Sequence, residues 1–340
     1  MKRIAILGGG SWGTALAIVL SRTHKPHEIS LWVRDAALAE SIRRDRENRP
    51  YLPGYKLPET VQVTHDAKAA LESAELVIGA IPAAYARSVY RNLLPHAVTG
   101  TPIVSATKGL EPATHARMSE VISQVQTQAT GPQRSAAPIA VLSGPSFAAE
   151  AAAGQPTAVV LASGDIALAN GLQEQLAAPN FRLYTNDDVL GVELAGAMKN
   201  VIAIAAGVCE GIGLGSNPLA ALITRGLAEM TRLAVALGAR AETLSGLAGL
   251  GDLVLTCTGS LSRNRHVGIE LGKGRTLTEI LKGMRMVAEG VGTAGALRAL
   301  GHEAGGIELP ITEQVEAILQ QGRPPRDAIR GIMDRPLKRE

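Results

Sequence analysis

The residues best suited to acid–base chemistry are a lysine and an aspartate, each set in an apolar segment. Lys199 lies beside Asn200 in a helix-length run of Ala, Gly, Val and Ile, where its neighbours one turn away are small. Burying such a pair without partners is costly, so this helix face is either exposed or functional. Asp252 follows Gly-Leu-Gly, where it either caps a helix or orients a lysine and keeps it charged, with Thr256 one turn later. A desolvated lysine held in this way can serve as a general acid or base.

Three further polar segments stand where a ligand could bind. Lys108 follows a predicted parallel strand, at the sheet edge that binds ligands in open α/β proteins, although a lone lysine is usually solvated. Residues 143–148 (SGPSFA) follow the next strand, and their ordinary interpretation is a turn whose serine caps a helix. Residues 262–265 (SRNR) are either a solvated face or a phosphate site, because Arg offers a bidentate fork and Ser and Asn offer neutral donors.

The N-terminal glycines predict a dinucleotide site. Gly8, Gly10 and Gly13 form the pattern G-x-G-x-x-G directly after an apolar strand at residues 3–7, and the pattern opens a helix. In this setting the first glycine makes the tight turn, the second admits a pyrophosphate and the third lets helix and strand pack closely. The helix N-terminus then offers N–H groups to the anion.

The end of the second strand bears on the choice between NAD and NADP. An acidic residue that holds the ribose hydroxyl is expected about 20 residues after the fingerprint, and that place falls at Val33-Arg34. Arg34 would pair with a 2′-phosphate, whereas Asp35 could still reach a hydroxyl, and a solvated arginine is the third interpretation. We therefore expect NADPH to be favoured and NADH to be tolerated.

The elements that must position these residues change character near residue 187. Before it, near-continuous Val/Ile/Leu strands alternate with helices, and after it the segments are long, Ala/Leu-rich and helix-periodic. We predict an α/β fold, with a Rossmann-type doubly wound, mostly parallel sheet in a dinucleotide-binding domain at 1–187. An all-helical substrate-binding and catalytic domain follows at 188–340. The predicted strands are 3–7, 28–33, 75–81, 102–106, 138–142, 159–162 and 182–185, and the predicted helices of the second domain are 189–210, 218–237, 241–247, 263–271, 276–281, 292–300 and 311–320.

Composition excludes several classes of protein. The 340 residues carry a net charge of +3 and only nine aromatic side chains, which argues against a nucleic-acid binder or a disordered chain. Cys209 and Cys257 form no CxxC motif, which predicts a reducing, cytoplasmic location. The most apolar run, residues 192–209, contains Glu193 and Lys199, so we expect no membrane span. The histidines show no metal-ligand spacing beyond one loop pair, and we expect no metal.

Six segments in this order resemble the bacterial NAD(P)-dependent glycerol-3-phosphate dehydrogenases, and the resemblance covers nearly the full length. The segments are residues 8–15 (GGGSWGTA), 106–109 (ATKG), 143–148 (SGPSFA), 199–201 (KNV), 249–253 (GLGDL) and 262–264 (SRN).

The resemblance implies a role for each matched residue. Lys199 is the implied proton donor and acceptor, and the other implied catalytic residues are Asp252, Thr256 and Lys108. The implied cofactor-binding residues are Gly8, Gly10, Ser11, Trp12, Gly13, Arg34, Lys108, Ala148, Arg263, Val287 and Glu289. The implied substrate-binding residues are Lys108, Gly144, Ser146, Lys199, Asp252, Ser262, Arg263 and Asn264.

The implied activity is the reversible, NAD(P)H-dependent reduction of dihydroxyacetone phosphate to sn-glycerol 3-phosphate, which supplies glycerophospholipid synthesis. A related dehydrogenase of the same architecture, acting on another hydroxy acid or phosphorylated substrate, is the alternative. The resemblance also makes a homodimer plausible.

Overall fold

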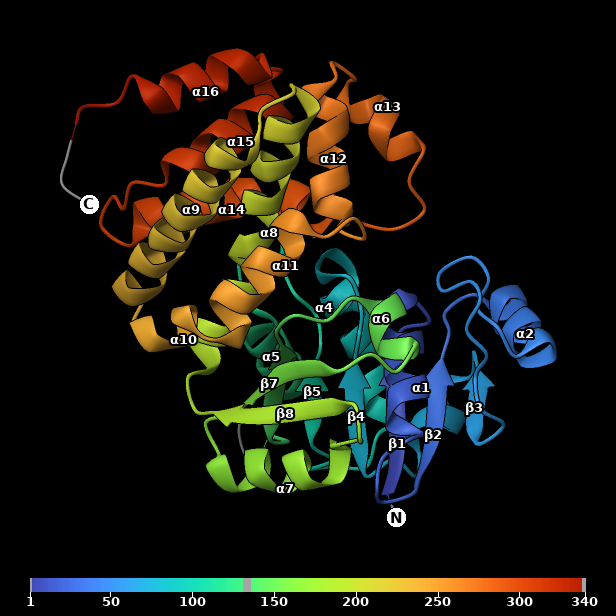
Figure 1. Cartoon of the computed structure of the whole chain (residues 1–340). Helices are drawn as coiled ribbons and strands as arrows, with labels where there is room; N and C mark the ends of the chain where they lie inside the picture. The colour runs from blue at the N-terminus through green and yellow to red at the C-terminus, as the bar shows by residue number, and fades with distance from the viewer. Residues whose placement is uncertain (1, 131–135, 338–340) are drawn as a thin grey trace. The chain divides into compact units, whose positions relative to one another are not determined.

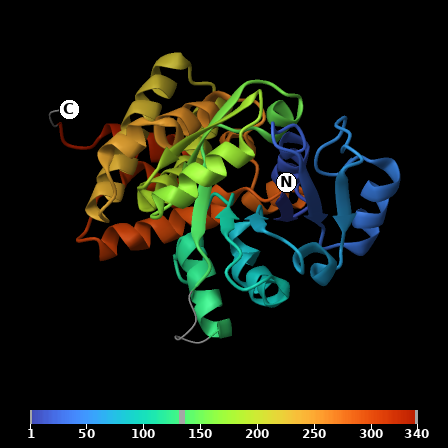
Figure 2. The ribbon, with the colours of Figure 1, turned by 90° about the horizontal axis from the view of Figure 1, so that it is seen from below.

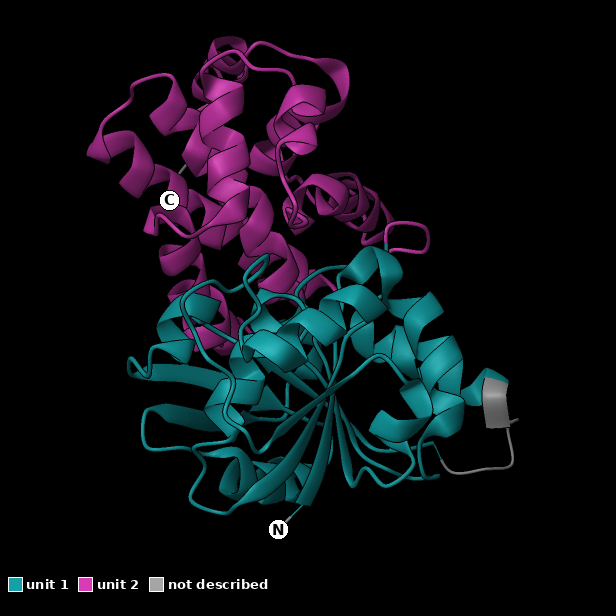
Figure 3. Cartoon of the chain, turned by 90° about the vertical axis from the view of Figure 1, so that its right-hand side faces the viewer, with its two compact units in different colours: residues 1–111, 116–193 teal, residues 112–115, 194–340 magenta. Residues whose placement is uncertain are grey.

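The chain divides into two units, coloured separately in Figure 3. The computed structural model describes residues 2–130 and 136–337. Unit 1 consists of Met1–Glu111 and Ala116–Glu193, and unit 2 of Pro112–His115 and Leu194–Glu340. The long helix α8 (Val189–Gly211) therefore begins in unit 1 and continues in unit 2.

Unit 1 is built on one eight-stranded sheet (Figure 1). The strand order is β3-β2-β1-β4-β5-β6-β7-β8, and each neighbouring pair is parallel except β6 and β7. This confirms the predicted mostly parallel α/β sheet. The strands are β1 (Lys2–Leu7), β2 (His27–Trp32), β3 (Val61–Thr64), β4 (Leu76–Gly79), β5 (Ile103–Ser105), β6 (Ile139–Ser143), β7 (Thr157–Ala162) and β8 (Phe181–Asn186).

Helices cover both faces of this sheet, as Figures 1 and 2 show from two directions. Alternate side chains of β1 point to opposite faces. Ile4 and Ile6 join a buried cluster with α1, α2, α6 and α7, whereas Ala5 and Leu7 join a second cluster with α3, α4 and α5. Burial on both faces explains why these strands are apolar throughout. The helices are α1 (Ser11–Leu20), α2 (Ala36–Asp45), α3 (Ala67–Leu71), α4 (Ala83–Leu93), the 3₁₀ turn η1 (Leu94–His96), α5 (Met118–Thr130), α6 (Ala148–Ala152) and α7 (Ile166–Leu176).

The sequence prediction missed one strand of this sheet. β3 is only four residues long (VQVT), and the exposed Gln62 stands between two buried valines. Such a short strand at the end of the sheet gives little hydrophobic pattern. It pairs with β2 in parallel register, from Ile29 opposite Val61 to Trp32 opposite Thr64.

In its described residues unit 2 is helical, as predicted. Two helices lie outside the predicted set: α11, which has only seven residues, and α16, which begins at a Pro-Pro pair. The elements after α8 are α9 (Ser216–Ala236), α10 (Ala241–Ser245), the π turn η2 (Leu247–Gly251), α11 (Asp252–Thr258), α12 (Arg263–Gly272), α13 (Leu277–Lys282), α14 (Glu289–Glu303), α15 (Pro310–Gln321) and α16 (Pro325–Met333).

Glycines bring α8 and α12 into backbone contact. A Cβ on Gly207 or Gly211 would overlap a backbone carbonyl of α12, and a Cβ on Gly268 would overlap the carbonyl of Ile204 on α8. A Cβ on Gly272 would lie 2.7 Å from the carbonyl oxygen of Val208. The two glycines of each helix are four residues apart and so lie on the same face. Each helix therefore presents a face of small residues to the other. This contact sets the distance between the helix that carries Lys199 and the helix that begins at residue 263.

Candidate active site

The glycine loop has a geometry that only glycine allows at two of its three fingerprint positions. Gly8 has φ +124°, and a Cβ there would lie 2.5 Å from the carbonyl oxygen of Ala80. A Cβ on Gly13 would overlap the carbonyl of Gly8. A Cβ on Gly10 would meet no atom within 4 Å among the described residues, so this position has room for a ligand. These are the three roles expected of a dinucleotide fingerprint.

The first turn of α1 is suited to an anion. Its N-cap is Gly10, which has no side chain to cap the helix. Ser11 Oγ donates to the carbonyl of Tyr51 at 2.6 Å. The Trp12 indole N–H is buried and has no hydrogen-bond partner in the described part of the chain. A helix start with no side-chain cap and the unsatisfied indole donor of Trp12 fit a bound pyrophosphate cofactor.

Arg34 and Asp35, the two candidates for the cofactor's ribose, have different surroundings at the end of β2. Asp35 is the N-cap of α2 and accepts a hydrogen bond from the Leu38 N–H at 2.8 Å, which engages its carboxylate in capping the helix. Arg34 is exposed, and its guanidinium carbon lies 5.8 Å from the centre of the Tyr85 ring. The Arg34 guanidinium therefore stays accessible, whereas the Asp35 carboxylate is already engaged within the chain.

Lys108, Gly144 and Ser146 come together at the ends of β5 and β6. Lys108 Nζ donates to the Gly144 carbonyl at 2.7 Å and to Ser146 Oγ at 3.0 Å, and Ser146 Oγ lies 2.8 Å from the same carbonyl. Ser146 does not cap the following helix, whose N-cap is Phe147. Ala148 is the first residue of α6 and packs against the core. Lys108 is therefore held by hydrogen bonds at the predicted edge of the sheet and does not extend freely into solvent as an ordinary surface lysine does.

Lys199, Asp252 and Thr256 form one buried cluster in unit 2. Lys199 Nζ lies 2.8 Å from Asp252 Oδ1 and 2.7 Å from Thr256 Oγ1, and the two charged side chains are 7% and 1% exposed. Thr256 Oγ1 donates to the backbone carbonyl of Asp252 at 2.6 Å. The sequence left Asp252 as either a helix cap or a partner of a lysine. Gly251 is the N-cap of α11, and the Asp252 carboxylate instead pairs with Lys199.

This cluster keeps an ammonium group in a place where water cannot solvate it. The nearby carboxylate replaces the lost hydration, and removing either partner would leave an uncompensated buried charge. Burial raises the pKa of the adjacent Cys257 thiol to about 12, so this thiol stays protonated at neutral pH. Cys257 is therefore not a nucleophile at neutral pH.

The segment 262–265 is not a uniform solvated face. Ser262 is buried and caps α12 by accepting the Arg265 N–H at 3.2 Å, and Arg265 pairs with Glu210. Asn264 is buried, its Nδ2 donates to Asn200 Oδ1 at 2.8 Å, and its Oδ1 accepts the Gly290 N–H at 2.9 Å.

Arg263 differs from its neighbours in this segment. Its side chain keeps exposed surface at the N-terminus of α12. Desolvation by the protein around it lowers the pKa of its guanidinium, and the charge of Glu289 opposes that shift. An arginine remains charged under such a shift, so Arg263 offers a cation at a helix start, where an anion is favoured.

The start of α14 brings the last predicted cofactor contacts near this cation. Glu289 is the first residue of α14, and Val287, two residues before it, is 37% exposed. Gly290 follows Glu289, so its hydrogen bond to Asn264 ties this segment to α12. Asn200, Asn264 and Gly290 thus link α8, α12 and α14 beside the buried lysine.

Two buried polar residues with several hydrogen bonds were not predicted. Glu193, six residues before Lys199, accepts hydrogen bonds from Ser119 N (2.8 Å), Ser119 Oγ (2.6 Å) and Arg117 Nη1 (2.8 Å). Burial raises the pKa of its carboxyl, and the charge of Arg117 opposes this shift. Asn48 lies in a polar loop and contacts the glycine loop. Glu193 could have been noticed as the single acid in the apolar run 192–209, whereas nothing in the local sequence marks Asn48.

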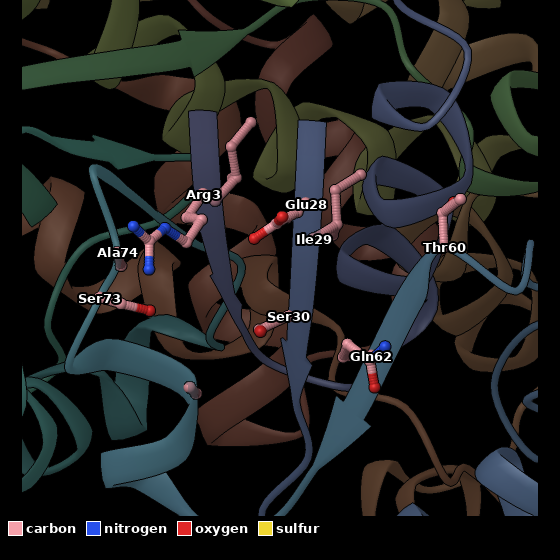
Figure 4. Close-up of a pocket in the computed structure, with 10 residues that line it drawn as sticks. Arg3, Glu28, Ile29, Ser30, Thr60, Gln62, Ser73 and Ala74 are labelled. Carbon is pink, nitrogen blue, oxygen red and sulfur yellow. The ribbon is translucent and has the colours of Figure 1, made fainter. Parts of the chain in front are cut away.

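A cavity of about 260 Å³ lies in unit 1 near the amino ends of β1 and β2 (Figure 4). Arg3, Glu28, Ser30 and Gln62 line it from neighbouring strands. Ligands of open α/β sheets bind at the opposite, carboxyl ends of the strands. We therefore do not assign this cavity to the cofactor.

A fingerprint loop with room for a pyrophosphate, together with a buried lysine–aspartate pair on a helical unit, defines a dinucleotide-dependent dehydrogenase. Comparison with known proteins narrows this class. The chain belongs to the NAD-dependent glycerol-3-phosphate dehydrogenase family: the model of the family's N-terminal domain matches residues 3–169, and that of its C-terminal domain matches residues 188–330. The family expected from the sequence motifs is thus confirmed.

The chain is similar to relatives over its whole length. It is 55% identical to the glycerol-3-phosphate dehydrogenase [NAD(P)+] of Acidobacterium capsulatum, with all of both chains covered. It is 52% identical to that of Koribacter versatilis, covering 100% of this chain and 99% of the relative. The crystal structure of glycerol-3-phosphate dehydrogenase from Coxiella burnetii has 42% identity and a TM-score of 0.91, covering 98% of this chain and 99% of the other. D-mandelate dehydrogenase with NADH, at 13% identity and a TM-score of 0.61, shares the fold alone.

Proposed function

We propose that this chain catalyses the reversible, NAD(P)H-dependent reduction of dihydroxyacetone phosphate to sn-glycerol 3-phosphate, supplying glycerophospholipid synthesis. The observation that carries the proposal is the buried Lys199–Asp252–Thr256 cluster, found in a chain 55% identical to a relative with this activity in its name. The bound nicotinamide supplies the hydride.

Lys199 is the proposed proton donor for reduction and acceptor for oxidation. Negative charge develops on the C2 oxygen of the substrate as its carbonyl is reduced, and an ammonium beside that oxygen stabilises the charge and donates the proton. Asp252 keeps Lys199 charged and aimed, and Thr256 Oγ1 fixes a second direction of the ammonium. Lys108 is the proposed second cation, with contacts to both substrate and cofactor.

The remaining proposed contacts divide between the two ligands. Gly144, Ser146, Ser262, Arg263 and Asn264 are assigned to the substrate, with the last three at its phosphate. The cofactor residues are Gly8, Gly10, Ser11, Trp12, Gly13, Arg34, Lys108, Ala148, Arg263, Val287 and Glu289. The structure uses both Asn264 polar atoms internally, so Asn264 would offer the phosphate only the second hydrogen of its amide nitrogen.

The test is a comparison of two substrates with two proteins. Wild type should oxidise NADPH rapidly with dihydroxyacetone phosphate and very poorly with unphosphorylated dihydroxyacetone, which has the same carbonyl. Arg263→Ala should lower kcat/KM about 30- to 1000-fold for the phosphorylated substrate, because it removes one partner of a desolvated charge pair, and much less for the other. Equal losses on both substrates would assign Arg263 to the cofactor or the helix, and no turnover by wild type would refute the proposed function.

We further propose that residues 1–187 form the dinucleotide-binding domain and residues 188–340 the all-helical substrate-binding and catalytic domain, and that each domain also adds a few contacts to the other ligand. The proposal includes NADPH as the favoured cofactor, a cytoplasmic location and a homodimer. One helix among the described residues, α8, is long and apolar enough to span a membrane, but it is mostly buried within the chain. Lys199 and Asn200 with their partners lie on that helix, which supports a core helix and no membrane span. The mass of the protein in solution tests the dimer.

A further inference from the structure

We infer that Asn48 is a positioning residue for cofactor binding: it holds the glycine loop in the conformation that receives the pyrophosphate. This inference rests on the proposed function, because it concerns the dinucleotide site. Asn48 lies in the connection between α2 and β3, outside the fingerprint and outside the residues assigned to cofactor or substrate.

Asn48 reaches the loop with both hydrogens of its amide group. Its side chain is fully buried, and Nδ2 donates to the carbonyl oxygen of Gly9 at 2.9 Å and to Thr14 Oγ1 at 2.8 Å. Gly9 lies inside the fingerprint, and Thr14 lies in the first turn of α1. One side chain therefore fixes both the loop and the helix start that follows it.

The bond to Gly9 sets the direction of the next N–H group. In a trans peptide the carbonyl and the following N–H point in opposite directions, so holding the Gly9 carbonyl directs the Gly10 N–H away from Asn48. A glycine-rich segment is otherwise free to rotate this peptide, and ordering it would then cost affinity when the cofactor binds. Because Asn48 orders the loop when the chain folds, this loss of conformational entropy does not reduce the affinity for the cofactor.

The other end of Asn48 supports a functional origin for this arrangement. Its Oδ1 is buried and has no hydrogen-bond partner among the described residues, an expense that a residue serving stability alone would avoid. Turning the amide around would lose the bond to the loop, because it would point Oδ1 at the Gly9 carbonyl, and both of these oxygens are acceptors. The amide is thus oriented by the loop that it holds.

The segment that carries Asn48 is itself anchored. Leu52 and Leu57 are buried in the core of unit 1, and the Leu52 N–H donates to the Asn48 carbonyl at 2.7 Å. Ser11 Oγ adds a second link by donating to Tyr51. Residues 48–57 therefore form a fixed support, against which Asn48 can hold the loop.

The experiment is a direct titration of NADPH and NADH, without substrate, against full-length variants. Asn48→Asp keeps the size of the side chain but places an acceptor against the Gly9 carbonyl. We expect it to weaken both cofactors about 10- to 100-fold by the same factor, because the pyrophosphate is common to both. At saturating NADPH, kcat should stay within about twofold of wild type.

Two further variants separate positioning from folding. Thr14→Val removes one acceptor of Asn48 without touching Asn48, and it should weaken both cofactors about 3- to 10-fold even if Asn48→Asp does not fold. Thr14→Ser keeps the hydroxyl and should restore wild-type affinity. The control is Asn180→Asp, because Asn180 Nδ2 makes the same kind of bond to a glycine carbonyl (Gly154, 2.7 Å) outside the loop; its cofactor affinity should not change.

The possible outcomes are distinct. If wild type binds NADPH and the Asn48 and Thr14 variants lose melting temperature but no cofactor affinity, Asn48 is merely structural and the inference is overturned. A loss confined to NADPH would also overturn it, because that pattern belongs to the 2′-phosphate. If wild type binds neither cofactor, the proposed function fails and the inference falls with it.

Discussion

The Lys199–Asp252 pair allows a prediction whose size can be worked from the structure. At 2.8 Å and an effective dielectric constant of about 20, two unit charges attract by about 6 kcal/mol. Most of this attraction offsets the cost of burying both groups, but removing one charge leaves the other buried and unpaired, at about 3–5 kcal/mol. Asp252→Asn keeps the shape of the side chain and removes only its charge, so it should lower the free energy of unfolding by this amount.

Thermal and urea unfolding measure this loss. For a unit of this size, 3–5 kcal/mol corresponds to a fall in Tm of roughly 6–20 °C. Glu308→Gln is the control, because Glu308 pairs with Arg335 in the same unit at 2.6 Å and its side chain is 65% exposed; its effect should be far smaller. In the same preparations Asp252→Asn and Lys199→Met should both lose at least about 10²-fold in kcat.

The double variant Lys199→Met with Asp252→Leu supplies the decisive comparison. Two apolar side chains of similar volume remove both buried charges, so stability should return to near that of wild type while activity stays lost. Two results would show that the charges do not stabilise each other. One is an Asp252→Asn variant as stable as wild type, and the other is a double variant less stable than both Asp252→Asn and Lys199→Met. A Lys199 variant with more than half the wild-type rate would remove the lysine from the chemistry.

Three further predictions concern the cofactor, the packing and the response to pH. Arg34→Ala should raise the KM for NADPH about 10- to 150-fold and leave that for NADH nearly unchanged; equal losses would place Arg34 at a shared part of the cofactor. Gly268→Ala should cost at least about 3 kcal/mol of unfolding free energy, since its Cβ would overlap the Ile204 carbonyl, whereas Gly171→Ala in α7, with open space around it, should be neutral or stabilising by up to about 1 kcal/mol. Burial raises the pKa of the Glu229 carboxyl, so its stabilising contribution is complete at low pH and is lost as pH rises through that raised pKa. The free energy of unfolding should be measured for wild type and Glu229→Gln from about pH 4 to pH 8. We expect wild type to become less stable relative to the variant as pH rises, and a constant difference would contradict this.

The sequence predicted the parts of the fold that follow from periodicity. The apolar strands around residues 3–7 and 75–81 could be found because burial on both faces makes them apolar throughout. β3 could not, because four residues with an exposed Gln62 show too little pattern. α11 was missed for a similar reason, since its seven residues are fewer than the roughly 11–18 over which helical periodicity can be recognised.

Residue type marked the candidate residues, whereas it did not show how they come together. A lysine in an apolar helix stood out because burying it without a partner is costly, while the glycine setting of Asp252 left a helix cap and a lysine partner both open. That Asp252 would meet Lys199 across 53 positions depends on how α8 and α11 pack, which no local pattern encodes. Asn48 shows the limit most clearly, because it acts on Gly9 and Thr14, 39 and 34 positions away, from a loop with no motif of its own.

The backbone contact between α8 and α12 has a consequence for how tolerance to mutation should be interpreted. A scan of substitutions along the chain should find intolerant positions at Gly207, Gly211 and Gly268 that meet no reactant, because backbone carbonyls cannot move aside for a methyl group. Gly207 lies eight residues from Lys199, about 12 Å along the helix. Ranking positions by intolerance alone would place such glycines among the catalytic residues. Redesign of substrate preference should leave them unchanged and vary the side chains that the two helices present.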